Sequence, residues 1–211
     1  MDGKFDITTF CNKGPIVGIL RGNTLDEAEF IADCYVQAGL YALEITMNTK
    51  GVGEIISVLS TKYPQLTIGA GTVCKPEDLD NAISYGAQFI VTPIIDEMVI
   101  SKAVEHGVPI FPGAYTPSEI YKAWSLGATA IKIFPATTLG PGYVKDVLAP
   151  LNEIKLLPTG GVARDNIKAF FDAGAFGVGM GSSLIDKKML AQRDADGLVS
   201  HLTSIKEAII K

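Results

Sequence analysis

No long hydrophobic run and no cluster of basic residues occurs in this sequence of 211 residues. No stretch approaches the roughly 20 apolar residues that cross a bilayer as a helix. The N-terminus has no basic segment followed by an apolar one, as a secretory signal would have. The net charge of −5 comes from interspersed acids and bases, a pattern that does not suit nucleic acid. We therefore expect a cytoplasmic protein with neither a membrane nor a nucleic-acid partner.

Cysteine and histidine are also scarce. Cys11, Cys34 and Cys74 form no CxxC spacing, and an odd number of cysteines argues against a disulfide framework. His106 and His201 belong to no HxH or HExxH arrangement. We interpret the cysteines as small apolar fillers or exposed thiols and His106 as a surface residue. The sequence thus predicts no metal site.

The sequence does contain a repeating rhythm of short apolar strands and amphipathic helices, about eight units in all. The apolar runs are mostly continuous, as expected where helices cover the outside of a parallel sheet. The expected strands are Ile16–Leu20, Ala42–Thr46, Leu66–Gly69, Phe89–Thr92, Pro109–Phe111, Ala130–Phe134, Lys155–Leu157 and Phe176–Met180.

Several of the intervening helical patterns have recognisable ends. Thr24 and Thr116 suit N-caps, and Pro76 suits a helix start. The expected helices include a short one around Asp6–Cys11, then Leu25–Gln37, Pro76–Tyr85, Asp96–Glu105, Pro117–Ser125 and Arg164–Asp172, with Leu198–Ile210 as the closing outer helix. Glycines suited to close helices in the left-handed conformation are Gly39, Gly86, Gly107, Gly127 and Gly174.

This regular alternation of strands and helices indicates parallel βαβ units with right-handed crossovers. Eight such units predict a (β/α)8 TIM barrel, and a doubly wound open sheet is the alternative fold. The hydrophobic share of 47% is enough to build the core of one domain spanning residues 1–211.

Lys132 stands in the middle of an apolar, β-branched strand, Ile131-Lys132-Ile133. Burial disfavours the charged form of a lysine, so its pKa falls and a nucleophilic amine becomes available near neutral pH. Such an amine condenses with a ketone to give a Schiff base. The structural alternative is a lysine whose stem follows the strand while its head reaches water.

The catalytic groups of a barrel come from the C-terminal ends of its strands and the loops that follow. Glu44 is the second charged residue within an apolar strand, and a carboxyl group opposite a desolvated lysine suits proton transfer. Its structural alternative is a carboxylate paired with a cation in the barrel. The candidate site residues at the strand ends are Arg21, Glu44, Thr46, Asn48, Thr72, Pro93, Lys132, Phe134, Thr159, Gly160, Gly161, Gly181 and Ser182.

Glycine-rich turns follow the seventh and eighth strands, at Gly160-Gly161 and at Gly181-Ser182. Glycines let backbone N–H groups approach a phosphate closely, and many barrels place a phosphate at this pair of loops. Ser182 adds a hydroxyl donor. Together the two turns favour a phosphate site.

The chain resembles the 2-keto-3-deoxy-6-phosphogluconate (KDPG) aldolases, class I enzymes also described as 4-hydroxy-2-oxoglutarate (KHG) aldolases. The resemblance covers nearly the whole chain. The motifs that carry it are Leu43-Glu44-Ile45-Thr46, Ile68-Gly69-Ala70-Gly71-Thr72-Val73, Val91-Thr92-Pro93, Phe111-Pro112-Gly113, Ile131-Lys132-Ile133-Phe134-Pro135-Ala136, Pro158-Thr159-Gly160-Gly161-Val162 and Gly181-Ser182.

By position, this resemblance implies that Lys132 is the Schiff-base nucleophile and Glu44 the general acid and base. It also implies that Thr72 meets the carboxylate of the pyruvoyl group and that Pro93 and Phe134 pack around the nucleophile. The phosphate would contact Gly160, Gly161 and Ser182. The resemblance further implies a homotrimer that needs no metal or organic cofactor and takes phosphorylated 2-keto-3-deoxy sugar acids and pyruvate as its small-molecule partners.

Asn48 departs from the gluconate-type pattern, which has a substrate-contacting arginine at this position. An asparagine cannot make the bidentate contact with a carboxylate or phosphate that arginine makes. The related 6-phospho-2-dehydro-3-deoxygalactonate aldolases resemble the chain here, with asparagine at this position and an Arg-Gly pair like Arg21-Gly22. Our hypothesis is that Arg21 supplies the missing cation, which leaves the preference between the C4 epimers open.

Three other functions stay open at this point. The first is a phosphosugar epimerase on a phosphate-binding barrel, and the second is a barrel that only binds a phosphorylated metabolite. The binding barrel leaves Lys132 and Glu44 in apolar strands without a reason, although buried charges are costly unless paired. The third is an aldolase for a non-phosphorylated 2-keto acid.

Overall fold

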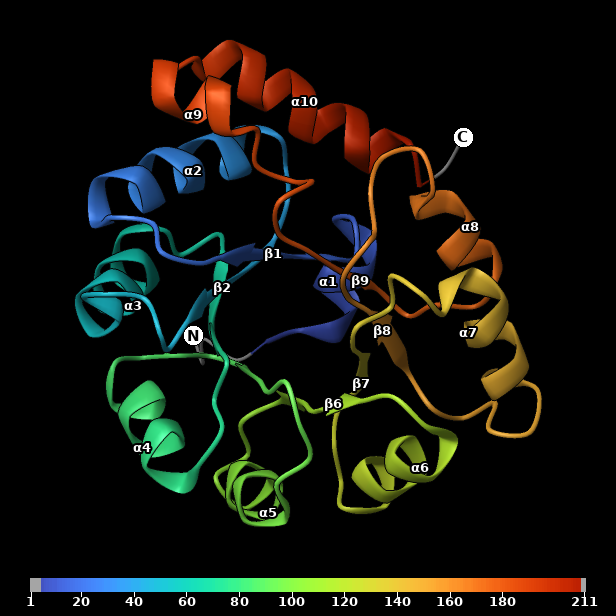
Figure 1. Ribbon diagram of the computed structural model, residues 1–211. Helices are drawn as coiled ribbons and strands as arrows, with labels where there is room; N and C mark the ends of the chain where they lie inside the picture. The colour runs from blue at the N-terminus through green and yellow to red at the C-terminus, as the bar shows by residue number, and fades with distance from the viewer. Residues whose placement is uncertain (1–4, 210–211) are drawn as a thin grey trace.

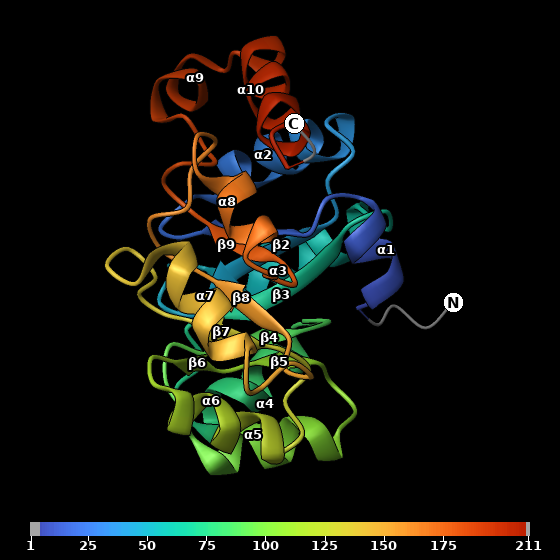
Figure 2. The same cartoon turned by 90° about the vertical axis from the view of Figure 1, so that its right-hand side faces the viewer.

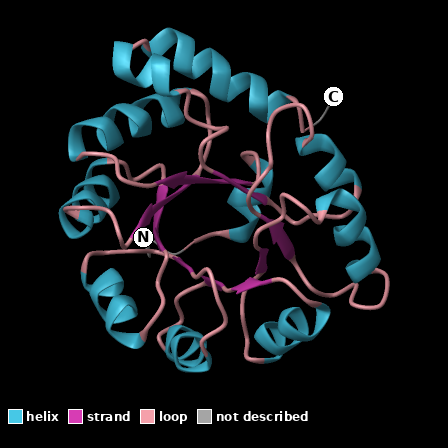
Figure 3. Cartoon of the chain, in the orientation of Figure 1, coloured by secondary structure: helices cyan, strands magenta, loops and turns pink. Residues whose placement is uncertain are grey.

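A ring of short parallel strands encloses the centre of the molecule, and helices surround the ring (Figures 1 and 3). The computed structural model describes residues 5–209. Its strands are β1 (Ile16–Leu20), β2 (Ala42–Thr46), β3 (Thr67–Gly71), β4 (Ile90–Val91), β5 (Ile110–Phe111), β6 (Gly113–Ala114), β7 (Ile131–Ile133), β8 (Leu156–Pro158) and β9 (Val178–Met180).

The strand order confirms the closed (β/α)8 barrel. One sheet has the order β5-β4-β3-β2-β1-β9 and the other has the order β6-β7-β8. A parallel bridge between Thr159 and Gly179 joins β8 to β9, and only Pro112 separates β5 from β6. Proline has no N–H to donate to a ladder, so the fifth barrel strand is split in two there. Because the ring closes, the open doubly wound sheet is excluded.

The helices follow the strands around the outside of the ring. Their bounds are α1 (Ile7–Asn12), α2 (Leu25–Gln37), α3 (Val52–Lys62), α4 (Pro76–Ser84), α5 (Glu97–Glu105), α6 (Pro117–Ser125), α7 (Gly140–Leu148), α8 (Ile167–Asp172), α9 (Lys187–Gln192) and α10 (Ala195–Glu207). None of the helices within residues 5–209 is long and apolar enough to cross a membrane.

Two helices, α2 and α6, have the expected bounds, and both begin with a complete capping box, Thr24 with Glu27 and Thr116 with Glu119. The five expected helix-closing glycines all have positive φ. The expected start of α8 at Arg164 is wrong by three residues, and α10 begins three residues earlier than expected, at a cap by the Asp194 carboxylate. Ile210, the expected last residue of α10, lies outside the described residues.

Aromatic side chains fill the barrel interior at its N-terminal end. Phe5 contacts the rings of Phe10, Phe89 and Phe111, with centroid separations of 5.1 to 5.3 Å. The helix α1 lies across this end of the barrel, away from the loop that leads into α7 (Figure 2). The interior is therefore packed at one end, and the polar strand-end residues lie at the other.

Candidate functional site

Strand alternation brings the two charged strand residues into the barrel. Along β7, Ala130 belongs to the interior cluster while Ile131 and Ile133 face the surrounding helices, so Lys132 points inward. Along β2, Ala42 lies in the same interior cluster, and Glu44 follows two residues later. Both side chains therefore lie inside the barrel, nearer to its C-terminal end than the packed rings of Phe5, Phe10, Phe89 and Phe111.

Lys132 and Glu44 are only 5% and 2% exposed. Burial is the largest influence on both, and it lowers the pKa of the Lys132 ammonium and raises the pKa of the Glu44 carboxyl. Each charge partly opposes the shift of the other. The Arg21 guanidinium lowers the pKa of both groups. The net effect favours the neutral amine that a nucleophile requires.

Within the described residues, Lys132 and Glu44 form no direct ion pair. The Lys132 Nζ atom instead lies 4.9 Å from the centre of the ring of Phe134, the residue that follows β7. An aromatic face stabilises a cation at this distance. The amine is thus close enough to Glu44 for charge coupling but is not neutralised by a salt bridge.

Arg21 and Thr72 meet above this pair. The Arg21 Nη2 atom donates a long hydrogen bond of 3.5 Å to Thr72 Oγ1. Thr72 has a φ of 58°, which is uncommon for a β-branched residue. Such conformations cluster where a side chain must be aimed. The structure thus brings together the expected carboxylate-binding threonine and the arginine that we expected to supply the missing cation.

Thr46 ends β2, two residues after Glu44, and Asn48 lies in the turn that follows. The Thr46 side chain is fully buried, and its hydroxyl is 3.0 Å from that of Thr49. Thr49 Oγ1 in turn accepts a 3.0 Å hydrogen bond from the backbone N–H of Gly22. Thr46 therefore supports the Arg21-Gly22 turn, whereas Asn48 is exposed in the turn after β2.

Pro93 packs close to the register position of the lysine. A Cβ added to Gly113 would lie 2.5 Å from the backbone of Pro93, and Gly113 pairs with Lys132 across β6 and β7. The proline backbone can approach this closely only because residue 113 is glycine. The structure therefore brings Pro93 against β6, the strand that pairs with β7 at Lys132.

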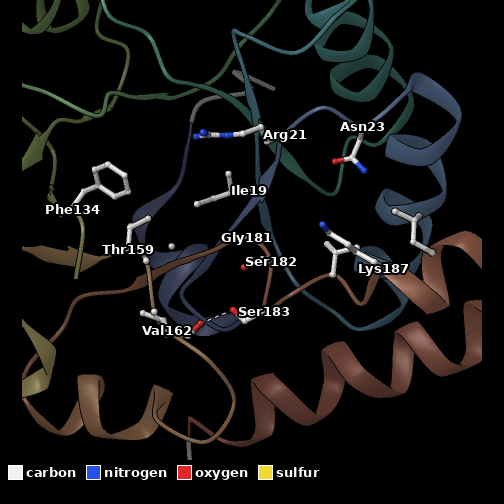
Figure 4. A pocket seen from close by; sticks show the side chains of 15 residues that line it. Ile19, Arg21, Asn23, Phe134, Thr159, Val162, Gly181, Ser182, Ser183 and Lys187 are labelled. Carbon is white, nitrogen blue, oxygen red and sulfur yellow. Dashed lines mark hydrogen bonds between the residues drawn. The ribbon is translucent and has the colours of Figure 1, made fainter. Parts of the chain in front are cut away.

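A cavity of about 460 Å³ opens beside these residues at the same end of the barrel (Figure 4). Seven of the expected site residues line it: Arg21, Phe134, Thr159, Gly160, Gly161, Gly181 and Ser182. The backbone N–H groups of Gly160, Gly161 and Ser182 donate to no other described residue. Gly161 has a φ of 76°, and a Cβ there would lie 2.9 Å from the Cα of Thr137. The cavity thus offers several backbone donors to an anion.

A side-chain hydrogen bond joins the two glycine-rich turns. Ser183 Oγ donates to the carbonyl of Val162 at 2.5 Å, as the dashed line in Figure 4 marks. Ser183, Asn23 and Lys187 all line the cavity, although the sequence did not single them out. Ser183 follows Ser182 directly, but no local pattern indicates that the loop before α9 turns Lys187 toward the barrel.

Two of the scarce residue types border this arrangement: the Cys74 Sγ atom lies 3.5 Å from the carbonyl oxygen of Thr72, and His201 Nε2 lies 3.3 Å from that of Ser183. The cysteines are free, with Cys11 exposed, Cys34 buried and Cys74 half-buried, and His106 is exposed. No group of three or more histidine, cysteine, aspartate or glutamate side chains within residues 5–209 is arranged to hold a metal ion.

The chain matches known proteins over most of its length. The model of the KDPG and KHG aldolase family matches residues 7–200. The 2-dehydro-3-deoxy-6-phosphogalactonate aldolase of Escherichia coli is 38% identical over 199 residues, which cover 93% of this chain and 97% of that protein. The 2-dehydro-3-deoxy-phosphogluconate aldolase of Pseudomonas aeruginosa is 38% identical over 165 residues, which cover 76% of this chain and 74% of that protein.

A solved structure described as native KDPGal has a TM-score of 0.84 and 37% sequence identity to this chain. The alignment covers 93% of this chain and 97% of that structure. The similarity therefore extends over nearly the whole chain.

Proposed function

The chain belongs to the KDPG and KHG aldolase family of carbon–carbon lyases, and we propose that it cleaves KDPG to pyruvate and glyceraldehyde 3-phosphate through a Schiff base. The observation that carries this proposal is the buried Lys132, whose pKa is lowered, coupled to the buried carboxyl group of Glu44 at the mouth of the barrel. The cavity beside this pair supplies the backbone donors that a phosphate needs.

In this mechanism the neutral Lys132 amine attacks the C2 ketone, and loss of water gives a protonated imine. Glu44, directly or through a water, removes the proton of the C4 hydroxyl. The C3–C4 bond then breaks, its electrons form an enamine, and the aldehyde leaves. The protonated Glu44 returns its proton to C3, and hydrolysis of the resulting imine releases pyruvate and regenerates Lys132.

We assign the remaining candidates to substrate binding. Arg21 and Thr72 bind the C1 carboxylate, since both offer donors beside Lys132. The glycine-rich turns bind the phosphate through Gly160, Gly161, Gly181 and Ser182, next to Thr159. Phe134 and Pro93 enclose the imine. Thr46 and Asn48 contribute through the loops that follow β1 and β2.

The C4 epimer, 2-dehydro-3-deoxy-6-phosphogalactonate, is the second candidate substrate. Two features favour it. The chain has Asn48 where the gluconate-type enzymes have arginine, and Arg21, which follows β1, supplies a positive charge beside Thr72 instead. This combination resembles the galactonate-type enzymes. The similarity to the Escherichia coli enzyme with this name covers nearly both chains. The test is to measure kcat/KM of the purified protein for each epimer and for 4-hydroxy-2-oxoglutarate. The substrate with the highest kcat/KM is the preferred one.

The chemistry itself is tested by incubating the protein with pyruvate and borohydride and then measuring its intact mass. We expect a reduced pyruvate adduct on the native protein and none on Lys132→Ala. An adduct on neither protein would exclude the imine, and an epimerase or a simple binding protein would then explain the cavity. Turnover of the non-phosphorylated acid alone would contradict the phosphate site.

We also propose that the chain acts as one barrel domain in a cytoplasmic homotrimer without a metal or organic cofactor, as the family resemblance implies. Large apolar side chains are exposed at Ile94, Met98 and Tyr121, near and on α5 and α6. Exposed apolar side chains of this size suit contacts between subunits. Light scattering on the purified protein should give about three times the mass of one chain, and a monomer would contradict this part of the proposal.

A further inference from the structure

Lys187, the first residue of α9, lines the cavity on the side opposite to Phe134 (Figure 4). Of the fifteen side chains that line the cavity in Figure 4, only Arg21 and Lys187 are cations, and none is a carboxylate. The two cations differ in direction. The Arg21 guanidinium turns toward Phe134, and the Lys187 ammonium extends toward the cavity from the side of α9 and Asn23.

The Lys187 ammonium has no partner within residues 5–209, either in an ion pair or in a hydrogen bond. The neighbouring carboxylate of Asp186 does not neutralise it, because that carboxylate caps α9 by accepting hydrogen bonds from the backbone N–H groups of Lys188 and Met189. Lys187 is thus an unpaired positive charge beside a cavity without acidic groups.

Arg21 does not serve the same end of the cavity. Its guanidinium contacts Thr72 and influences the pKa values of Lys132 and Glu44, so its charge acts at the carboxylate end of the site. The glycine-rich turns at the other end offer uncharged N–H and hydroxyl donors. A phosphate carries up to two negative charges at neutral pH, and a lysine is a well-suited point charge for it.

We propose that Lys187 is a specificity-determining residue that binds the substrate phosphate together with the Gly160-Gly161 and Ser182 turns. It makes the enzyme select phosphorylated over non-phosphorylated 2-keto-3-deoxy sugar acids. This inference rests on the proposed aldolase function and adds to it the source of the positive charge at the phosphate end.

The test compares Lys187→Ala with Lys188→Ala, a matched loss of one exposed lysine from the same helix that does not line the cavity. For the phosphorylated acid we expect Lys187→Ala to raise KM about 10- to 100-fold, with kcat nearly unchanged, because one charge-assisted contact is lost. For the same acid without its phosphate, kcat/KM should not change. Lys187→Arg should restore most of the affinity, and Lys188→Ala should behave like the native protein.

Inhibition by inorganic phosphate gives a second measurement. Its inhibition constant against the phosphorylated acid should rise in Lys187→Ala and stay unchanged in Lys188→Ala. The inference is overturned if Lys187→Ala keeps the native preference for the phosphorylated acid, or if Lys188→Ala weakens binding equally. If the native protein forms no adduct with pyruvate, the proposed function fails, and calorimetric titration with inorganic phosphate still decides the role of Lys187.

Discussion

A Cβ atom added to Gly71 would lie 2.5 Å from Oε1 of Glu44 and 2.8 Å from its Cδ. Gly71 ends β3, beside the last residue of β2 in the parallel register. No carbon atoms pack this closely, so Gly71→Ala must displace the Glu44 carboxylate. We expect kcat for aldol cleavage to fall about 100-fold, the typical cost of misplacing a catalytic group by about 1 Å.

The matched control for this change is Gly142→Ala in α7, where an added Cβ has nothing within 4 Å and φ is not positive. It should leave kcat unchanged. The borohydride-trapped pyruvate adduct should still form in Gly71→Ala, since Lys132 is not touched. Native kcat in Gly71→Ala would show that the position of the Glu44 carboxylate does not limit the reaction.

The coupled charges predict opposite pH shifts in two variants. The Glu44 carboxylate raises the pKa of Lys132, and the Arg21 guanidinium lowers it. Because only the neutral amine attacks pyruvate, the trapping rate falls as pH drops through the pKa of Lys132. The midpoint of this fall should move to lower pH in Glu44→Gln and to higher pH in Arg21→Gln. Shifts in the same direction in both variants would contradict the coupling.

Arg21→Lys tests the source of the cation at the carboxylate end. Lysine keeps the positive charge but lacks the planar guanidinium that can bind a carboxylate through two parallel hydrogen bonds. We expect the affinity for pyruvate, measured from the concentration dependence of borohydride trapping, to fall about 10-fold. Unchanged affinity would mean that Arg21 does not bind the carboxylate.

Local signals determined which parts of the fold could be predicted. The helix Leu25–Gln37 had a threonine cap and a clear apolar period, and its expected bounds were correct. The sequence has no such signal for α3, whose N-cap is the left-handed Gly51 without a side-chain hydrogen bond, or for α7, which begins with Gly-Pro-Gly. The split of the fifth strand at Pro112 depends on how a ladder forms, which no single strand pattern indicates.

Some residues of the candidate site could likewise be predicted from local sequence signals, and others could not. Lys132 and Glu44 could be found because each interrupts an apolar strand, and strand alternation alone turns both inward. The engagement of the Thr46 hydroxyl by Thr49, and the approach of Lys187 to the cavity, depend on loops packed by distant segments. The spacing of residues along the chain does not predict either contact.

Lys132→Met should stabilise the fold while abolishing cleavage. Lysine ordinarily titrates near 10.5, and burial gives Lys132 a lower pKa in the folded chain. Between these two values the unfolded chain binds more protons than the folded one, so Lys132 lowers the free energy of unfolding at neutral pH, and this cost shrinks as pH rises. Methionine has a similar shape and no charge. At pH 7 we expect the free energy of unfolding, measured by urea denaturation, to rise by about 1.4 kcal/mol for each unit by which folding lowers the pKa of Lys132.

The gain should diminish as the pH approaches the ordinary pKa of lysine, because the unfolded native chain then loses its extra proton. Lys168→Met is the control, since the Lys168 side chain is 43% exposed and pairs with Asp172 one turn away on α8. Removing such a surface pair changes stability by less than about 0.5 kcal/mol. A Lys132→Met variant less stable than the native protein at pH 7 would mean that the charge coupling to Glu44 outweighs the cost of burial. The lysine would then contribute to the fold as well as to the reaction.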